Sequence, residues 1–522
     1  MLRPRGYSSM VQQARAKVAS LPSPTGGWNA RDVISDMPVG DAFTLTNLFP
    51  STSGVNIRGG ATNHATGMSG QVQTVMDYNG AATSKMFAID ATGLSIYETT
   101  AAGAATVTSV TGLTNAWWEY ANISTSGGNY LYCVNGVDKP RLYDGTTWTA
   151  IDAASTPAIT GVTTTTLDNV LLFKNRLWFI EKNTLKAWYL PTQAIGGAAS
   201  AYDLRSIARE GGYLVAMDVL SLDAGYGLDD NLVFVTSEGE IIIYRGTDPA
   251  SAATWTLIGV WQLGSPIGKR CTLKWGGDVL VNTLDGLTPL SSVLQSQVLD
   301  SRAAISDKIQ NAISDAAASY GSTRGWQLLS YPAGDALIIN VPVAVGSQQQ
   351  YVMNAITKSW CNFTGWPANC WVLFNDLPYY GGNGVVVRAW DTTYSDGSST
   401  IQTAAQQAFN YFEERGVKKY FTRARPSILT TGTPTIQIGV NVDFDTNFTS
   451  SSLTYAASSA AIWDTSVWDT GLWGQGMTVS NSWQGITGIG YCASVQFQSA
   501  SKGVNIQWAS TDIVYQTGWA GI

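Results

Sequence analysis

The sequence predicts a mainly β fold, a β-propeller with a helical insertion and a C-terminal β-sandwich or barrel-like region. Its 522 residues include 53 glycines, 17 prolines and 20 tryptophans, a composition that favours short strands and tight turns. Hairpins also recur about every 45 residues, the spacing of four-stranded propeller blades. Only 13% of the residues are charged and 45% are hydrophobic, which excludes a disordered chain.

The first segment, residues 1–31, is predicted to be a basic arm. No acidic residue precedes Asp32, and helix-forming residues between 8 and 20 give way to a stretch rich in Pro and Gly. This pattern predicts a short helix over about residues 8–20. The candidate subunit-docking residues of the arm share a positive charge and are Arg3, Arg5, Arg15 and Lys17.

Residues 32–395 are predicted to form the propeller. A strand, a turn with Gly, Asn or Asp, and a second strand ending in an aromatic residue recur here, as in KMFAIDATGLSIYE at 85–98. Successive second strands close at positions 46, 45, 56 and 46 residues apart, namely Tyr97, Tyr143, Trp188, Tyr244 and about Leu290. Stacked β-sandwiches are the competing interpretation, because they also place turns at short, regular intervals.

Two further segments complete the chain. Near 291–322, apolar residues such as Ile305, Ile309 and Ile313 recur at steps of three to four residues, which predicts a helical excursion. A boundary is expected near 392–405, where the composition turns to Ser, Thr and Gly. Alternating strands after it predict a C-terminal β-rich domain over 396–522, a sandwich or barrel with one solvated face.

Several classes of protein are excluded. His64 is the only histidine, so metal sites built from several histidines are ruled out. No run of residues is long and apolar enough for a membrane-spanning segment, and no signal peptide is expected. The chain has no phosphate-binding loop, dinucleotide fingerprint or nucleophile elbow, so we expect neither an enzyme nor a cofactor. The five cysteines are interpreted as reduced thiols: Cys133, Cys271, Cys361, Cys370 and Cys492.

Two clusters of residues with carboxylate or amide oxygens have a spacing that could suit a hard cation. They are Asp443, Asp445 and Asn447 in one, and Asp223, Asp229 and Asp230 in the other. Phe448 occupies the position where a calcium loop needs Gly, so the first cluster is interpreted as acidic residues on the solvent-exposed face of a strand. The second is interpreted as solvated turn residues, with cation binding left open.

Aromatic residues give two weak signals for sugar binding. WDTSVWDTGLWG places tryptophans five residues apart, at Trp463, Trp468 and Trp473, where exposed rings could stack on sugars or bases. Packing of two strands against a sheet is the favoured interpretation. YDGTTW around Asp144 is superficially similar to the aspartate boxes of sialidase-like propellers, which are themselves structural turns.

Basic residues cluster on one predicted strand and in the arm. KKYFTRARP contains Lys418, Lys419, Arg423 and Arg425, and alternation places Lys419, Phe421, Arg423 and Arg425 on one face, where they could contact an acidic neighbouring subunit. The net charge is −7, and the arm contributes five basic residues and no acidic one, so the remainder carries −12. This balance argues against tight binding of nucleic-acid phosphates, although DNA could slide past such a surface.

Several long blocks resemble tail proteins of short-tailed bacteriophages. They include GGWNARDVISDMPVGDAFTLTNLFP at 26–50, LLFKNRLWFIEKNTLKAWYLP at 171–191, VFVTSEGEIIIYRGTDPASAATW at 233–255 and QQQYVMNAITKSWCNFTGW at 348–366. The chain resembles tail nozzle proteins, also called tail tubular protein B, and the related tail-hub and packaged-DNA stabilisation proteins. The resemblance covers roughly residues 27–520 and carries no catalytic motif.

The resemblance implies a structural virion protein, synthesised in the host cytoplasm. It implies a homo-hexameric ring below the tail adaptor and portal, enclosing the channel that retains packaged DNA and conducts it at infection. Tail fibres are a further candidate partner, and DNA passes through the lumen without sequence-specific binding. The alternative is a glycan-binding or glycan-cleaving β-propeller of a phage tail, which would need carboxylates converging on a cleft.

Overall fold

A computed structural model of the protein describes residues 16–223, 228–295, 304–344, 346–447, 451–453 and 477–517. The chain forms two compact units. One is Arg58–Ser399, and the other combines the described residues before it with those after it. Residues 32–57, which the sequence assigned to the propeller, lie in the second unit.

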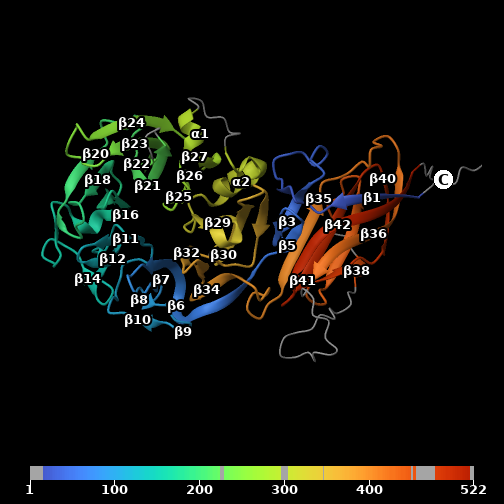
Figure 1. Ribbon diagram of the computed structural model, residues 1–522, viewed down its shortest axis with the longest axis horizontal. Coiled ribbons are helices and arrows are strands. Elements are labelled where there is room, and N and C mark those ends of the chain that lie inside the picture. Colours follow the sequence, from blue (N-terminus) through green and yellow to red (C-terminus); the bar gives the residue numbers. More distant parts are fainter. Residues whose placement is uncertain are drawn as a thin grey trace, which may run out of the picture. The chain divides into compact units, whose positions relative to one another are not determined.

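The unit Arg58–Ser399 is a β-propeller (Figure 1). Its described strands form seven blades. The first strands of blades 2 to 7 contact one another in series, and the first strand of blade 7 contacts that of blade 1, so these strands surround the propeller axis. A small helical insertion interrupts the series. The predicted fold class is confirmed.

The blades follow the chain in order, each running from its first strand outward. Blade 1 consists of residues 72–78 of β6 (Gly60–Tyr78), β7 (Lys85–Asp90), β8 (Ile96–Glu98) and β10 (Thr106–Val107). Blade 2 consists of β11 (Glu119–Thr125), β12 (Gly128–Val134), β13 (Arg141–Tyr143) and β14 (Trp148–Ala150). Blade 3 consists of β16 (Leu167–Phe173), β17 (Arg176–Glu181), β18 (Lys186–Tyr189) and β20 (Ser200–Asp203).

The remaining blades continue this pattern. Blade 4 consists of β21 (Leu214–Asp223), β22 (Leu228–Thr236), β23 (Glu240–Gly246) and β24 (Trp255–Gln262), and blade 5 of β25 (Thr272–Trp275), β26 (Asp278–Thr283) and β27 (Gly286–Pro289). Blade 6 consists of β28 (Gln327–Tyr331), β29 (Ala336–Ala344), β30 (Ser347–Asn354) and β31 (Trp360–Phe363). Blade 7 consists of β32 (Cys370–Phe374), β33 (Leu377–Gly381), β34 (Asn383–Asp391) and residues 60–71 of β6. Strand β9 (Gly103–Ala104) pairs parallel with β6, and β15 (Ile159–Thr160) and β19 (Gly197–Ala198) form a separate two-stranded sheet.

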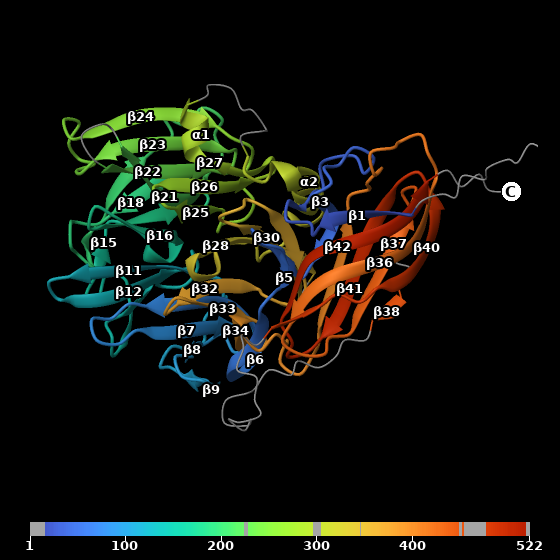
Figure 2. The same cartoon turned by 45° about the vertical axis from the view of Figure 1, so that its right-hand side comes forward.

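Strand β6 closes the propeller, and Figure 2 shows it beside β34 and β7. Its first part is the outermost strand of blade 7, and its second part is the first strand of blade 1. The two chain ends of the unit are also joined by a buried ion pair. Arg58 donates to both carboxylate oxygens of Asp396, at 2.9 and 2.6 Å, and its guanidinium lies 4.6 Å from the centre of the Trp366 ring.

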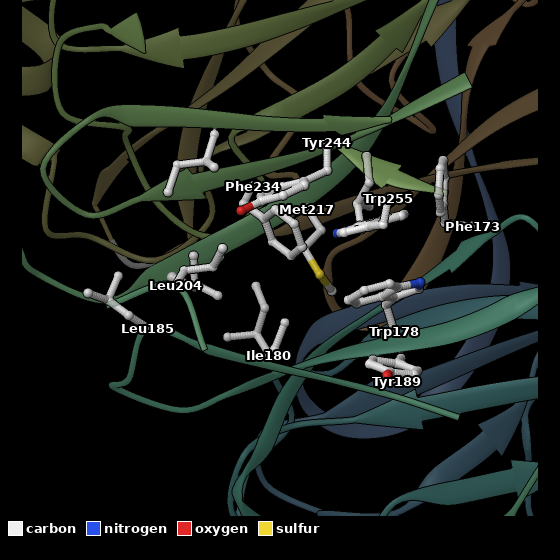
Figure 3. Packing of buried hydrophobic residues seen from close by; sticks show 14 residues of the cluster. Phe173, Trp178, Ile180, Leu185, Tyr189, Leu204, Met217, Phe234, Tyr244 and Trp255 are labelled. Carbon is white, nitrogen blue, oxygen red and sulfur yellow. The ribbon is translucent and has the colours of Figure 1, made fainter. Parts of the chain in front are cut away.

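Apolar side chains fill the spaces between adjacent blades. Between blades 3 and 4, Trp178 stacks on Trp255 with ring centroids 5.6 Å apart, and Trp255 stacks on Tyr244 at 5.4 Å (Figure 3). Aromatic rings bury a large area with well-defined geometry, so they suit the wedge between two twisted sheets. This packing accounts for many of the aromatic residues in the hairpin pattern.

The helical excursion predicted near 291–322 is present as two short α-helices. They are α1 (Leu290–Gln295) and α2 (Gln310–Tyr320), and the described residues between them include the 3₁₀ turn η3 (Asp307–Ile309). Ile313 of α2 is fully buried, and the helix contacts β27 and β29. The insertion therefore packs between blades 5 and 6. Two more 3₁₀ turns, η1 (Thr164–Thr166) and η4 (Pro332–Gly334), precede β16 and β29.

The second unit is a sandwich of two sheets. One contains β1 (Ala16–Pro22), β4 (Leu48–Pro50), β5 (Val55–Ile57), β36 (Lys419–Thr430), β39 (Thr478–Ser480), β40 (Gln484–Gly490) and β42 (Ile506–Thr517). The other contains β2 (Gly27–Trp28), β3 (Asp41–Thr46), β35 (Ile401–Gln407), β37 (Ile436–Val442), β38 (Ser451–Leu453) and β41 (Ala493–Ser501). Phe497 and Trp508 stack across the two sheets, with centroids 5.0 Å apart.

The helix predicted over about residues 8–20 is wrong for its described part. Ala16–Pro22 is a β-strand that pairs antiparallel with β42, from Ala16 opposite Gln516 to Pro22 opposite Ser510. Pairing with β42 gives the backbone groups on one side of this strand hydrogen-bond partners and overrides a weak helical preference. Residues 8–15 lie outside the described part of the chain.

Candidate functional site

A cavity of the propeller lies where the first strands of five blades begin. Its volume is about 400 Å³. The lining residues at or just before the starts of these strands include Glu119, Asp168, Leu214, Arg270 and Trp326, from blades 2 to 6. Because these strands surround the axis, we call this cavity the channel mouth.

Arg270 is the central charged group of the channel mouth. Its Nε donates to the Glu119 carboxylate at 3.0 Å, and its Nη2 donates to the Trp118 carbonyl at 2.8 Å. A longer contact of 3.3 Å joins Nη1 to Gln327. Burial is the largest single influence and lowers the pKa of Arg270, but Glu119, Cys370 and Tyr120 together outweigh it, so the pKa is raised. Arg270 therefore holds the starts of three blades together as a permanently charged link.

A second ion pair crosses the same cavity. The Lys269 ammonium binds the Asp168 carboxylate, which joins blade 5 to blade 3. Two guanidinium groups lie over the Trp117 ring, that of Arg270 at 5.3 Å and that of Arg324 at 5.9 Å from its centroid. Such contacts are favourable because the ring face is electron-rich.

The chemistry that this arrangement can perform is limited by its ion pairs. The lining carboxylates, Glu119 and Asp168, are each bound by a basic side chain. A glycosidase needs one carboxylic acid that can donate a proton and a second carboxylate opposite it. The geometry instead suits binding, with positive charge in excess.

The predicted docking residues are only partly described. Arg3, Arg5 and Arg15 lie outside the described residues. Lys17 forms an exposed ion pair with Glu414, at 2.7 Å. This contact ties β1 to the segment before β36, so Lys17 serves its own unit.

The acidic clusters are engaged in local contacts. Asp229 lies 3.4 Å from Lys174, and Asp230 accepts a hydrogen bond from Ser221 at 2.6 Å. The side chain of Asp223 lies outside the described part. Among the residues that the structure describes, no group of three or more acids, cysteines or histidines could hold a metal ion.

The cluster at 443–447 is a turn and not the wet face of a strand, because β37 ends at Val442. Asp443 accepts a backbone hydrogen bond from Tyr491 at 2.7 Å, and Asp445 accepts one from Asn447 at 3.0 Å. Asp443 has a positive φ of 48°, a conformation that Asp tolerates in turns. These acids stabilise a loop.

The predicted basic face of β36 is wrong. A β-bulge between Phe421 and Arg423 adds one residue, so the strand changes the face it presents. Lys419 and Phe421 are fully buried, whereas Arg423 is exposed. The Lys419 ammonium donates to three carbonyls, those of Glu414, Val417 and Tyr491, at 2.5, 3.0 and 3.0 Å.

The other residues singled out have structural contacts where they are described. His64 contacts the Thr99 carbonyl at 3.1 Å and the edge of the Tyr379 ring. Asp144 closes a tight turn by accepting hydrogen bonds from the Thr146 and Thr147 amides. The tryptophans of the 463–474 repeat lie outside the described part. All five cysteines are free and buried, in agreement with the prediction.

No sequence motif identified the channel mouth as a site. Glu119 and Arg270 are 151 residues apart, and neither belongs to a recognisable motif. The clue that could have found them is their position, at or just before the first strand of a blade. Recognising this position in the sequence requires knowing where each blade begins.

Comparisons with known proteins do not identify a family. No protein-family model matches the chain, and no curated protein matches it. YCF48 from Cyanidioschyzon merolae is 11% identical, covers 63% of this chain and 98% of its own, and has a TM-score of 0.37. The Cps50 (Swd1) β-propeller domain of Myceliophteria thermophila is 15% identical, covers 62% and 98%, and has a TM-score of 0.38.

No helix in the described ranges is long and apolar enough to cross a membrane.

Proposed function

We propose that the protein is a structural subunit of a phage tail nozzle, a ring, expected to be hexameric, through which DNA leaves the capsid. The proposal begins from the resemblance of four long sequence blocks to nozzle proteins. It places the protein in the virion, next to a tail adaptor and, through it, the portal.

The observation that carries the proposal is the closure of the propeller. A channel that conducts DNA under pressure needs subunits whose blades do not separate under mechanical force. Strand β6 belongs to both blade 7 and blade 1, so separating these blades requires breaking many backbone hydrogen bonds together. The Arg58–Asp396 ion pair joins the two chain ends of the same unit. Both features favour a subunit that resists mechanical force.

The charge of the propeller supports the same role. Residues 58–399 contain 19 basic and 27 acidic residues, a formal net charge of −8. A negative net charge repels the DNA backbone and disfavours the counterion-releasing contacts that hold DNA. DNA could therefore slide past such a subunit without being retained by it.

The glycan-cleaving alternative receives no comparable support. The carboxylates that line the channel mouth are Glu119 and Asp168, and both are ion-paired. We therefore retain the structural role as the single proposal.

Electron micrographs of the purified protein mixed with the adaptor–portal assembly of the same virion test the proposal. We expect averages with a sixfold ring at the adaptor end. Failure to bind the assembly, together with binding to host polysaccharide, would reject the nozzle role.

The arm can be tested in the same experiment. Substituting Arg3, Arg5 and Arg15 by Gln removes positive charge while leaving Lys17 to pair with Glu414. If the arm docks on an acidic ring, this triple variant binds the assembly more weakly, and the loss is greatest at low salt. The matched control is Arg205→Gln, which removes an exposed charge from blade 3. Equal binding by both variants would exclude docking through the arm.

A further inference from the structure

The channel mouth has a charge opposite to that of the propeller around it. Four basic residues line it, namely Lys182, Lys269, Arg270 and Arg324, against the two acidic residues Glu119 and Asp168. The propeller as a whole carries a net charge of −8. Positive charge is therefore concentrated at one end of the axis.

Two of these basic residues are neutralised within the protein and two are not. Arg270 binds Glu119, and Lys269 binds Asp168. Lys182 donates to the Gly136 carbonyl at 3.3 Å, and Arg324 lies over Trp117. No ion pair within the described residues engages either Lys182 or Arg324. The cavity thus keeps two positive charges without an anion.

The loop that carries Arg324 adds neutral donors. Ser322 and Thr323 line the cavity beside it, between α2 and β28. Gly325 follows with φ of +120°, a conformation that other residues rarely adopt, and this sets the direction in which the chain enters β28. Hydroxyls next to a guanidinium form the kind of donor set that binds phosphate or carboxylate oxygens.

We infer that the channel mouth binds a compact anion with at least two negative charges, held by Lys182 and Arg324 with the Trp117 ring as a wall. The cavity volume of about 400 Å³ lies in the range of small-molecule sites, which is about 300–1,000 Å³. Partial enclosure lowers the effective dielectric and strengthens the attraction relative to bulk water. Phosphoryl and polycarboxylate ligands share this chemistry. The inference does not depend on the nozzle role.

Isothermal titration calorimetry of the full-length protein at low salt tests the inference, with pyrophosphate and citrate as probes. We expect one binding site per chain for at least one probe. Binding of pyrophosphate alone identifies a phosphoryl ligand, and binding of citrate alone identifies a carboxylate ligand. Absence of binding heat for both probes would overturn the inference.

Variants locate the site. Arg324→Gln removes a charged donor, and since such hydrogen bonds contribute about 1.5–3 kcal/mol, affinity should fall about tenfold or more. Lys182→Gln should weaken binding in the same way. Lys358→Gln is the matched control, because Lys358 also lies over a tryptophan ring, Trp275 at 5.7 Å, but does not line the cavity. Wild-type affinity in both cavity variants, with unchanged melting temperatures, would reject the site.

Discussion

The buried Arg58–Asp396 ion pair should be the strongest single ion pair that stabilises the closed propeller. The substitution Arg58→Met tests this contribution directly. The Arg58 side chain is fully buried, and the Asp396 side chain is 17% exposed. Besides its two bonds to Asp396, Arg58 donates to the Thr364 carbonyl at 2.8 Å. Methionine fills much of the same volume but leaves the carboxylate and the carbonyl without their donor.

The expected cost follows from the loss of one partner of a buried pair. Removing one partner destabilises a protein by about 3–5 kcal/mol, because a charge stays buried without compensation. The propeller unit spans 342 residues, from Arg58 to Ser399. At about 2.1 cal/mol/K per residue its unfolding entropy is about 0.7 kcal/mol/K, so its melting temperature should fall by about 4–7 °C.

Differential scanning calorimetry of the full chain measures this shift. Arg205→Met is the matched control, because Arg205 pairs with Asp203 in the same propeller but its side chain is 70% exposed. The melting temperature of this control should stay close to that of the wild type, as expected for a surface ion pair. The double variant Arg58→Met with Asp396→Leu should recover part of the loss. A melting temperature unchanged by Arg58→Met would refute the role of the pair.

Three further predictions concern ionisable side chains. Desolvation is the main cause that raises the pKa of Asp218, so the ionised carboxylate destabilises the folded protein at neutral pH. Asp218→Asn should therefore have a higher melting temperature than wild type at pH 7. This difference in melting temperature should disappear as the pH falls towards about 4. Lys419→Met leaves three carbonyls without their donor and should cost the sandwich about 2–4 kcal/mol in calorimetry, whereas Lys418→Met should be neutral. Burial raises the pKa of the cysteine thiols, to about 11 for Cys370. A thiol reagent should therefore modify the native protein far more slowly than the unfolded protein. Rapid labelling of the native protein would contradict the burial of these cysteines.

The repeat spacing predicted the propeller because it follows a real structural period. Tyr97, Tyr143, Trp188 and Tyr244 lie in β8, β13, β18 and β23, which are the third strands of four successive blades, and Leu290 directly follows β27. Each marks the same place in its blade, where an aromatic or large apolar side chain packs against a neighbouring sheet. The local sequence pattern was sufficient to predict this part of the fold.

Other features depended on contacts that are distant in sequence. The strand at Ala16–Pro22 forms because β42 offers a partner about 500 residues later. The face of β36 is set by a bulge after Phe421, which no propensity reveals. The channel mouth brings Glu119 and Arg270 together only when several blades are in place. A single sequence does not contain these pairings in readable form.

The mass of the purified protein in solution, measured by light scattering with and without its adaptor and portal, tests the nozzle role most directly. One chain has a mass of 55.8 kDa, so a ring of six would have about 335 kDa. We expect that mass for the protein alone, or six added copies on the adaptor–portal assembly. A protein that stays at 55.8 kDa and leaves the mass of the assembly unchanged would contradict the account.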